Sequence, residues 1–359
     1  MSDHAVLDRI LHGNTLEILP TLPPHSVDLV FADPPYNLQL RQDLWRPNMT
    51  LVDAVDDEWD QFEDFRTYDE FTRAWLLAVH DVMKATATIW ISGTYHNIFR
   101  VGALLQDLGF WILNTVVWLK GNAMPNFRGK RLKNDVEFVI WAKRSKEARY
   151  TFHHRAMKQF NKGKQLGSVW QIPLCGGEER LRDGSGKKLH PTQKPEELLR
   201  RILLASSDPG DVVLDPFVGS GTTAAVAKQL HRHWIGIEQD ATYVRAARKR
   251  VEAVRPLDAD HPLLKNVGDR SARVSFKTLL ERGFLQPGEA LYLDGSGPVA
   301  TILEDGLLQV DGFVGSIHKV GAQLKQMPFC NGWTHWYYRD DETGQLRPID
   351  VLRQQSRER

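Results

Sequence analysis

Short apolar runs recur through the first 255 residues and alternate with helical patterns. Runs of strand length occupy residues 27–31, 86–91, 111–119, 136–142, 212–214 and 234–237. Between them, apolar positions recur every three or four residues over 71–79, 98–108 and 196–206, which is the spacing of a helix with one buried face. Strands that alternate with helices in this way form βαβ units, so the pattern predicts an α/β fold.

The pattern changes beyond residue 255. A helix that starts near Asp240 is predicted to end before Pro256, and a polar stretch follows. We then predict a helix over residues 275–282 and short strands over 300–303 and 307–310. These features predict a first domain over residues 1–258, a linker over 259–270 and a small α+β domain over 271–359.

Composition adds limits on the class of protein. The 359 residues are 42% apolar, which is enough for two buried cores. There is no long apolar run, and the first residues lack the features of a signal peptide, so we expect a cytoplasmic protein without a membrane span. Cys175 and Cys330 make neither a disulfide framework nor a metal-ligand spacing, so we expect no metal.

The net charge of +1 conceals a strong segregation of charge along the chain. Residues 1–119 carry a net charge of −10, residues 120–200 carry +11, and the remainder is balanced. Lysine and arginine neutralise phosphates, so we expect a nucleic-acid-binding segment over about 120–190, with candidate contacts at Arg128, Lys130, Arg131 and Lys133. The acid-rich stretch over 53–70 is expected to be solvated or to form an interaction surface.

One tetrapeptide is a candidate catalytic motif. The predicted strand over 27–31 is followed by Ala32 and then by Asp33, Pro34, Pro35 and Tyr36. The two prolines have no N–H, which leaves the carbonyls of Pro34 and Pro35 free to accept hydrogen bonds from a ligand. A carboxylate beside a carbonyl can hold both hydrogens of an aromatic amine, and Tyr36 can stack against the ring. The motif predicts an amine-activating site, although Asp and Pro are also common in ordinary turns.

A second motif lies far downstream and predicts a cofactor site. Gly219 and Gly221 follow the strand over 212–214 and would let the backbone approach a ligand closely. The next strand ends in Glu238, where a doubly wound fold places an acid that grips ribose hydroxyls. The remaining candidates around the two glycines are Asp215, Pro216, Phe217, Ser220, Thr222 and Thr223.

Together the two motifs resemble those of the S-adenosylmethionine-dependent amino-methyltransferases of DNA. A third segment agrees: His190, Thr192 and Lys194 lie in the sequence His-Pro-Thr-Gln-Lys-Pro, which in the family precedes the glycine motif and lines the cofactor pocket. The catalytic motif precedes the cofactor motif, as in the circularly permuted β class. The resemblance implies a Rossmann-like methyltransferase fold, S-adenosylmethionine as cofactor, and direct methyl transfer without a covalent enzyme intermediate.

The C-terminal region resembles the restriction-adenine-methylase-associated domain. The resemblance rests on the segments around Asp305, Ser316 to Gly321, and Asn331 to Trp336. It implies DNA contact, for which the candidates are Ser316, Lys319, Asn331 and Trp333. The alternative for Trp333 is that it forms part of the core of a small domain.

The whole arrangement resembles most closely the cell-cycle-regulated adenine methyltransferases of alphaproteobacteria and their restriction-linked relatives. This implies methylation of adenine N6 within GANTC in double-stranded DNA by base flipping, a nucleoid-associated enzyme and a homodimer. Asp33 favours adenine, because cytosine-amine enzymes of the family more often carry Ser there. An RNA adenine methyltransferase, an N4-cytosine DNA methyltransferase and an inactive DNA-binding protein remain alternatives. Cytosine C5 chemistry is excluded, because Leu174 rather than Pro precedes Cys175.

Overall fold

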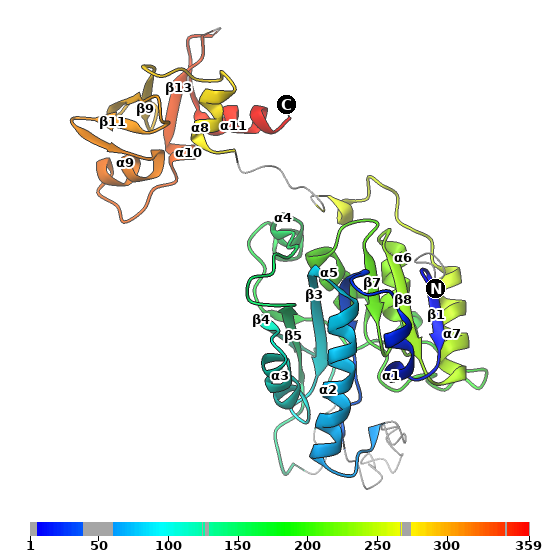
Figure 1. The fold of residues 1–359 in the computed structure, drawn as a ribbon. Coiled ribbons are helices and arrows are strands. Elements are labelled where there is room, and N and C mark those ends of the chain that lie inside the picture. Colours follow the sequence, from blue (N-terminus) through cyan, green and yellow to red (C-terminus); the bar gives the residue numbers. More distant parts are fainter. Residues whose placement is uncertain are drawn as a thin grey trace. The chain divides into compact units, whose positions relative to one another are not determined.

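The computed structural model describes residues 6–38, 60–123, 125, 129–265, 267, 274–341 and 343–358 (Figure 1). The chain forms two compact units, Met1–Gly268 and Asp269–Arg359. Leu257, Leu263, Leu264 and Val267 pack against the core of the first unit. The first unit therefore extends past residue 258, because these side chains are partly buried against its core.

An eight-stranded sheet forms the centre of the first unit. Its order is β1-β8-β7-β2-β3-β5-β4-β6. In that order the strands are β1 (Arg9–His12), β8 (His233–Glu238), β7 (Val212–Asp215), β2 (Val27–Ala32), β3 (Met83–Gly93), β5 (Val136–Lys143), β4 (Trp111–Leu119) and β6 (Val169–Gln171). The six strands expected from the apolar runs are all present, with ends that differ by at most three residues.

The sheet is mixed. The strands β1, β8, β7, β2 and β3 run parallel to one another, whereas β5 runs antiparallel to both of its neighbours, β3 and β4. The described residues between β4 and β5 form no helix, so the βαβ alternation expected from the sequence does not continue in this part of the described chain. The carboxyl ends of the five parallel strands nevertheless meet at one edge of the sheet.

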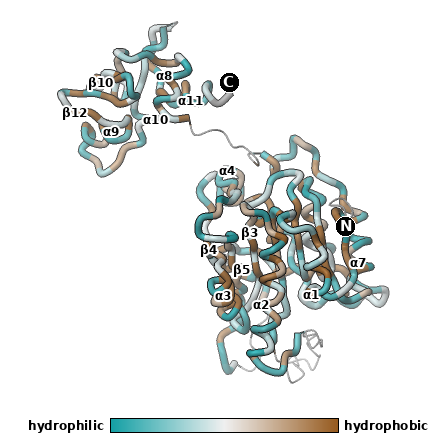
Figure 2. The backbone as a smooth tube through the Cα atoms, viewed as in Figure 1, coloured by the Kyte–Doolittle hydropathy of each residue, from teal (hydrophilic) through white to brown (hydrophobic). Residues whose placement is uncertain are grey.

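Helices cover both faces of this sheet (Figure 1). On one face, α2 (Phe65–Val82) and α3 (Ile98–Asp107) bury residues such as Trp75 and Val101 against Val30 and Ile89. On the other face, α5 (Glu196–Ser206) and α6 (Thr222–Gln229) pack on Leu29 and its neighbours. Figure 2 shows the hydrophobic residues concentrated along the strands between these layers. The Rossmann-like fold prediction is confirmed.

The remaining elements of the first unit are short or peripheral. The helix α7 (Ala241–Ala253) packs beside β1 and α6, and Asp240 caps its first turn. Asp64 caps α2 by accepting from the Thr67 N–H at 2.7 Å, so this helix begins well before residue 71. The short elements are α1 (Thr15–Ile18), η2 (Leu19–Thr21), α4 (His154–Met157), η4 (Lys158–Asn161), η5 (Gly177–Glu179) and η6 (Pro262–Leu264).

The second unit is an α+β domain with its own core, as predicted. Its antiparallel sheet has the order β12-β11-β10-β9-β13-β14. The strands are β9 (Ala290–Leu293), β10 (Val299–Ile302), β11 (Leu308–Val310), β12 (Phe313–Gly315), β13 (Trp336–Arg339) and β14 (Leu346–Pro348). The helices are α8 (Phe276–Glu281), α9 (Ile317–Leu324), α10 (Gly332–His335) and α11 (Ile349–Glu358). Trp336 and Leu291 lie at the centre of the core.

Candidate active site

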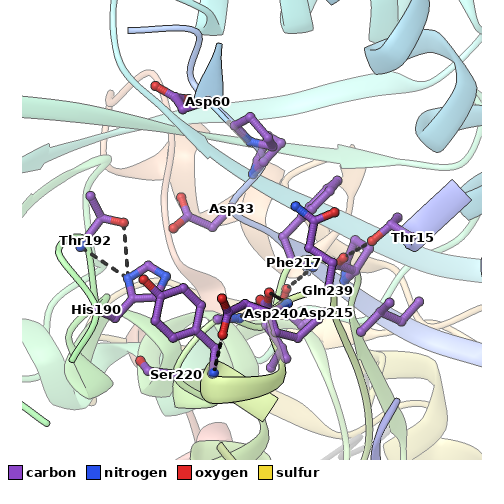
Figure 3. A pocket seen from close by; sticks show the side chains of 18 of the residues that line it. Thr15, Asp33, Asp60, His190, Thr192, Asp215, Phe217, Ser220, Gln239 and Asp240 are labelled. Carbon is purple, nitrogen blue, oxygen red and sulfur yellow. Dashed lines mark hydrogen bonds between the residues drawn. The ribbon is translucent and has the colours of Figure 1, made fainter. Parts of the chain in front are cut away.

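The two sequence motifs meet at the carboxyl edge of the sheet. Asp33 follows β2, Asp215 ends the neighbouring strand β7, and Glu238 ends β8. Because β2 pairs with β7 and β7 with β8, Asp33 and Gly219 open into one cavity although they lie 186 positions apart in the chain. The volume of this cavity is about 330 Å³. Figure 3 shows Asp33, His190 and Asp240 facing the same space.

Almost all of the predicted catalytic and cofactor-binding residues line this cavity. They come from the segment after β2, from the His190 segment, and from the turns that follow β7 and β8. They are Asp33, Pro34, Pro35, Tyr36, His190, Thr192, Lys194, Asp215, Pro216, Phe217, Gly219, Ser220, Thr222, Thr223 and Glu238.

Gly221 is the exception. It does not line the cavity, and a Cβ atom at this position would lie 2.9 Å from both Cα and Cβ of Ala247 in α7. Its φ of +83° is also in the left-handed region that favours glycine. Gly221 therefore allows α6 to pack closely on α7, and its role beside the cofactor stays a prediction.

Asp33 is held by two donors. Its Oδ2 accepts a hydrogen bond of 2.6 Å from Lys194 Nζ, and its Oδ1 accepts one of 2.7 Å from the Tyr36 hydroxyl. The Tyr36 hydroxyl also lies 2.9 Å from Ser92 Oγ, which is fully buried. Burial, followed by the negative charges of Asp33 and Glu137, raises the pKa of Tyr36, which keeps the phenol protonated and able to donate. The carboxylate is thus fixed before any substrate binds.

The two prolines of the motif differ in their surroundings. The Pro35 carbonyl accepts a hydrogen bond of 2.9 Å from the buried Tyr68 hydroxyl. The expectation that both proline carbonyls are free is therefore wrong for Pro35. Among the described residues the Pro34 carbonyl accepts no hydrogen bond, which leaves it as the main-chain acceptor beside Asp33.

Asp60 is a site residue that the sequence did not indicate. Its carboxylate accepts hydrogen bonds from the main-chain N–H groups of Tyr36, Asn37 and Leu38 at 2.5, 2.9 and 2.9 Å. It is 3% exposed, so of the two expectations for the acidic stretch over 53–70, a solvated stretch or an interaction surface, the first is wrong at this position. Burial raises the pKa of Asp60, and the three hydrogen bonds partly offset this rise. Residues 53–59 lie outside the described part of the chain.

Lys194 belongs to a chain of alternating buried charges. Its Nζ lies 4.0 Å from Glu137 Oε2, and Glu137 Oε1 lies 3.3 Å from Lys120 Nζ. Burial alone would lower the pKa of Lys194, but Asp33 and Glu137 outweigh this effect and the pKa is raised. Lys194 thus contacts the Asp33 carboxylate, a contact that the family motif did not specify. Glu137 and Lys120 were not singled out from the sequence, because the basic segment contains many similar residues.

His190 forms a neutral wall beside the glycine turn. Burial lowers the pKa of His190 to about 4, so the imidazole is uncharged near neutral pH. Its Nδ1 accepts from the Thr192 N–H at 3.2 Å, which places the ring proton on Nε2. A Cβ atom at Gly219 would lie 3.0 Å from this Nε2, and the φ of Gly219 is +50°. Gly219 therefore keeps space open inside the cavity, and its close approach to a cofactor stays a prediction.

Two acids shape the opposite wall. Asp215 accepts hydrogen bonds from Thr223 Oγ1 at 2.5 Å and from the Phe217 N–H at 3.0 Å, and burial raises the pKa of Asp215 to about 7. Glu238 accepts from the Gly219 N–H at 3.0 Å and from the Asp240 N–H at 2.8 Å. Burial raises the pKa of Glu238 as well. Main-chain donors thus fix the carboxylate predicted to hold ribose at the cavity.

The predicted DNA contacts of the first unit lie in the loop between β4 and β5. Lys130, Arg131 and Lys133 are exposed there, and Arg131 donates to the Tyr95 hydroxyl at 2.9 Å. Arg128 lies outside the described residues. The loop leads into β5, whose second residue is Glu137.

Some of the predicted DNA-contacting residues of the second unit lie at the surface, and one lies in the core. Lys319 and Asn331 are exposed, and Ser316 caps α9 by accepting from the Lys319 N–H at 3.3 Å. Trp333 is 8% exposed and packs in the domain core, where Arg353 lies 4.6 Å from its ring centroid. This burial favours the alternative that Trp333 is a core residue, and its contact with DNA stays a prediction.

Other chemistries find little support in the described residues. They contain no group of three or more His, Cys, Asp or Glu residues placed to hold a metal ion. Burial raises the pKa of Cys175 to about 11, which leaves this thiol protonated and unreactive. No helix in the described ranges combines the length and the apolar character needed to cross a bilayer.

Comparison with protein families matches these features. The model of the DNA methylase family matches residues 27–249, which contain both motifs and most of the cavity. The chain belongs to this DNA methylase family. The model described as Restriction Enzyme Adenine Methylase Associated matches residues 257–359, which agrees with the resemblance of the second unit.

Curated members of the family cover much of the chain. The Type II methyltransferase M.HinfI of Haemophilus influenzae is 44% identical over 331 residues, which are 92% of each chain. The Type II methyltransferase M2.DpnII of Streptococcus pneumoniae is 42% identical over 245 residues, covering 68% of this chain and 89% of that protein. The protein is therefore a DNA methyltransferase, and particular closeness to the cell-cycle-regulated enzymes is not established by these relatives.

A solved structure agrees with the fold. The cytosine-N4-specific PvuII DNA methyltransferase aligns with a TM-score of 0.53 and 22% identity, covering 74% of this chain and 94% of that one. Methylases of the family use S-adenosylmethionine, so this is the cofactor of the protein. The cavity fits it: Gly219 leaves room beside His190, and the carboxylates of Glu238 and Asp240 suit hydroxyl groups and a positive charge.

Proposed function

We propose that this protein methylates the N6 amine of adenine in double-stranded DNA, after the adenine has left the base stack. The observation that carries the proposal is the fixed Asp33 carboxylate, which shares one cavity with the glycine turn after β7. S-adenosylmethionine supplies an electrophilic methyl group when it is bound. Glu238 and the Gly219 turn would hold the cofactor, and Asp33 would orient the amine toward it.

Asp33 and the Pro34 carbonyl act on the amine by geometry. An exocyclic amine is flat because its lone pair is delocalised into the ring, and two acceptors on its hydrogens favour a nucleophilic, tetrahedral nitrogen. No strong base is required, because the amine becomes acidic only after it has gained the methyl group. Alignment of nucleophile and methyl carbon can supply about 7–11 kcal/mol of the barrier.

The choice of adenine rests on Asp33, since Ser is more common at this position in the cytosine-amine enzymes of the family. The resemblance of the whole arrangement to the cell-cycle-regulated adenine methyltransferases and their restriction-linked relatives further implies the site GANTC, a homodimer and association with the nucleoid. The basic segment over 120–200, net charge +11, supports duplex DNA as the partner through its phosphates. Size-exclusion chromatography with light scattering would determine the oligomeric state.

The test is analysis of DNA from cells that express the protein. Nucleoside mass spectrometry is expected to show N6-methyladenine, and methylation-sensitive sequencing is expected to place it within GANTC. N4-methylcytosine in its place, or methyl transfer to RNA rather than to duplex DNA, would contradict the proposal. Absence of S-adenosylmethionine binding would favour an inactive DNA-binding protein.

Substitution of the catalytic carboxylate gives a second test. Asp33→Ala removes the acceptor for the amine, so we expect turnover to fall by about 10³-fold or more while S-adenosylmethionine still binds, because the glycine turn is intact. Single-turnover kinetics and calorimetry measure the two quantities. Turnover close to that of the wild type would show that another group holds the amine.

A further inference from the structure

Lys194 places a cation directly beside the catalytic acceptor. Its side chain is 8% exposed and lines the cavity, and its Nζ lies 2.6 Å from Asp33 Oδ2. The same nitrogen lies 5.2 Å from the centroid of the Tyr36 ring. A donor and an acceptor thus stand side by side at the edge of the ring on which a base is proposed to stack.

Both the main chain and the ammonium group of Lys194 are held in place by neighbouring residues. Its carbonyl accepts from Thr222 Oγ1 at 3.2 Å, and Thr222 Oγ1 in turn accepts from Arg250 at 2.8 Å. Glu137 attracts the ammonium from the side of β5. An ammonium carries three hydrogens, and Asp33 takes one of them, so Lys194 can donate to a ligand without releasing the carboxylate.

The pair Asp33–Lys194 matches the Watson–Crick edge of adenine. That edge presents the N6 amine, a donor, next to the ring nitrogen N1, an acceptor. We propose that Lys194 donates to N1 of the flipped adenine while Asp33 accepts from N6. This proposal rests on the proposed function and adds a base-reading residue to it.

The arrangement would also reject the wrong bases. Guanine and thymine present a carbonyl oxygen and a ring N–H at the corresponding positions, so oxygen would face Asp33 and the N–H would face Lys194. Both contacts are repulsive. Cytosine has the same order of amine and ring acceptor as adenine. The pair Asp33–Lys194 therefore excludes guanine and thymine but does not distinguish adenine from cytosine, which must be separated by the size of the site.

A donor at N1 draws electrons away from the amine. Lys194 is therefore expected to contribute to binding and orientation more than to reactivity. Lys194→Met should raise KM for DNA and should lower kcat less than Asp33→Ala does. The charged groups that face Lys194 are Asp33 after β2, Glu137 on β5 and Asp215 on β7.

The decisive experiment removes N1 from the substrate. GANTC duplexes carry adenine, 1-deazaadenine or 7-deazaadenine at the target, and kcat/KM is measured for the wild type, Lys194→Met, Lys194→Arg and the exposed-lysine control Lys249→Met. Loss of N1 should lower kcat/KM about 10- to 100-fold for the wild type and for Lys249→Met, the usual size of a hydrogen bond to a charged group. For Lys194→Met the penalty should shrink below about 3-fold, and Lys194→Arg should restore part of it.

Two controls separate this result from other causes. The 7-deazaadenine duplex keeps N1, so it should affect all variants equally. Thermal unfolding shows whether Lys194→Met is folded, and if its turnover is too slow, dissociation constants of the same duplexes replace kcat/KM. An equal N1 penalty in the wild type and Lys194→Met would overturn the proposal. No wild-type activity on the unmodified duplex would instead contradict the proposed function.

Discussion

At the scale of single residues, Asp215 should make stability depend on pH. Burial raises the pKa of Asp215 from its ordinary value of 3.8 to about 7, so the folded protein keeps a proton that the unfolded chain has lost. The stabilisation is complete below the ordinary value and disappears as pH rises through about 7. Asp215→Asn cannot ionise, so its thermal midpoint should rise relative to the wild type between about pH 4 and pH 8.

The expected change is on the order of 2–4 kcal/mol, because one pKa unit corresponds to about 1.4 kcal/mol. Thermal unfolding of both proteins without cofactor, at a series of pH values, measures it. A difference between the two midpoints that stays constant with pH would show that Asp215 ionises alike in the folded and unfolded chains.

The cavity residues that could be predicted from the sequence are those that lie in contiguous motifs. Asp33 and Gly219 follow apolar runs, and the chemistry of each is visible from its neighbours. Asp60 could not be distinguished from the other acids around it, because its role depends on three N–H groups that are distant in the chain. Glu137 is one acid in a basic segment, and only the folded sheet brings it beside Lys194.

At the scale of elements, substitution of the two glycines of one motif should have different effects on cofactor affinity and on stability. Gly219→Ala places a methyl group against His190 in the cavity, so S-adenosylmethionine affinity should fall by about 10-fold or more with a small loss of stability. Gly221→Ala forces α6 away from α7, at a cost of roughly 1–3 kcal/mol for overpacking. Its thermal midpoint should fall by roughly 2–10 °C.

Gly210→Ala is the matched control for this pair. Its φ of +85° is close to that of Gly221, but a Cβ atom there has nothing within 4 Å, so it reports the backbone strain alone. Calorimetry and thermal unfolding of the three variants separate the effects. Equal losses of cofactor affinity in Gly219→Ala and Gly221→Ala would contradict the assignment of Gly221 to helix packing.

Most helices and strands of the first unit could be predicted from the periodicity of apolar residues. Residues 111–119 and 196–206 match β4 and α5 at both ends. The direction of β5 was not readable, because a short apolar run has the same pattern in a parallel and in an antiparallel strand. The start of α2 was missed because its first turn, from Phe65, is mostly exposed and is fixed by the Asp64 cap.

At the scale of the whole molecule, we expect the two units to have different roles in DNA binding. The first should bind phosphates, and the second should contribute to sequence recognition. The segment over 120–200, within Met1–Gly268, carries a net charge of +11, whereas residues 201–359 are balanced. Phosphate contacts produce salt dependence without sequence preference, and contacts to bases produce preference. The second unit offers polar candidates such as Lys319 and Asn331. We therefore expect it to contribute discrimination more than general affinity.

Removal of residues 269–359 tests this division. All cavity residues lie in the first unit, so the truncated protein should bind S-adenosylmethionine with unchanged affinity. Its DNA affinity should still fall steeply with salt, because the basic segment remains, but its preference for a GANTC duplex over a GANTC-free duplex should drop by about 10-fold or more. In the full chain, Lys319→Ala combined with Asn331→Ala should reduce the same preference. Intact preference after truncation would place recognition entirely in the first unit, whereas a flattened salt dependence would place phosphate binding in the second.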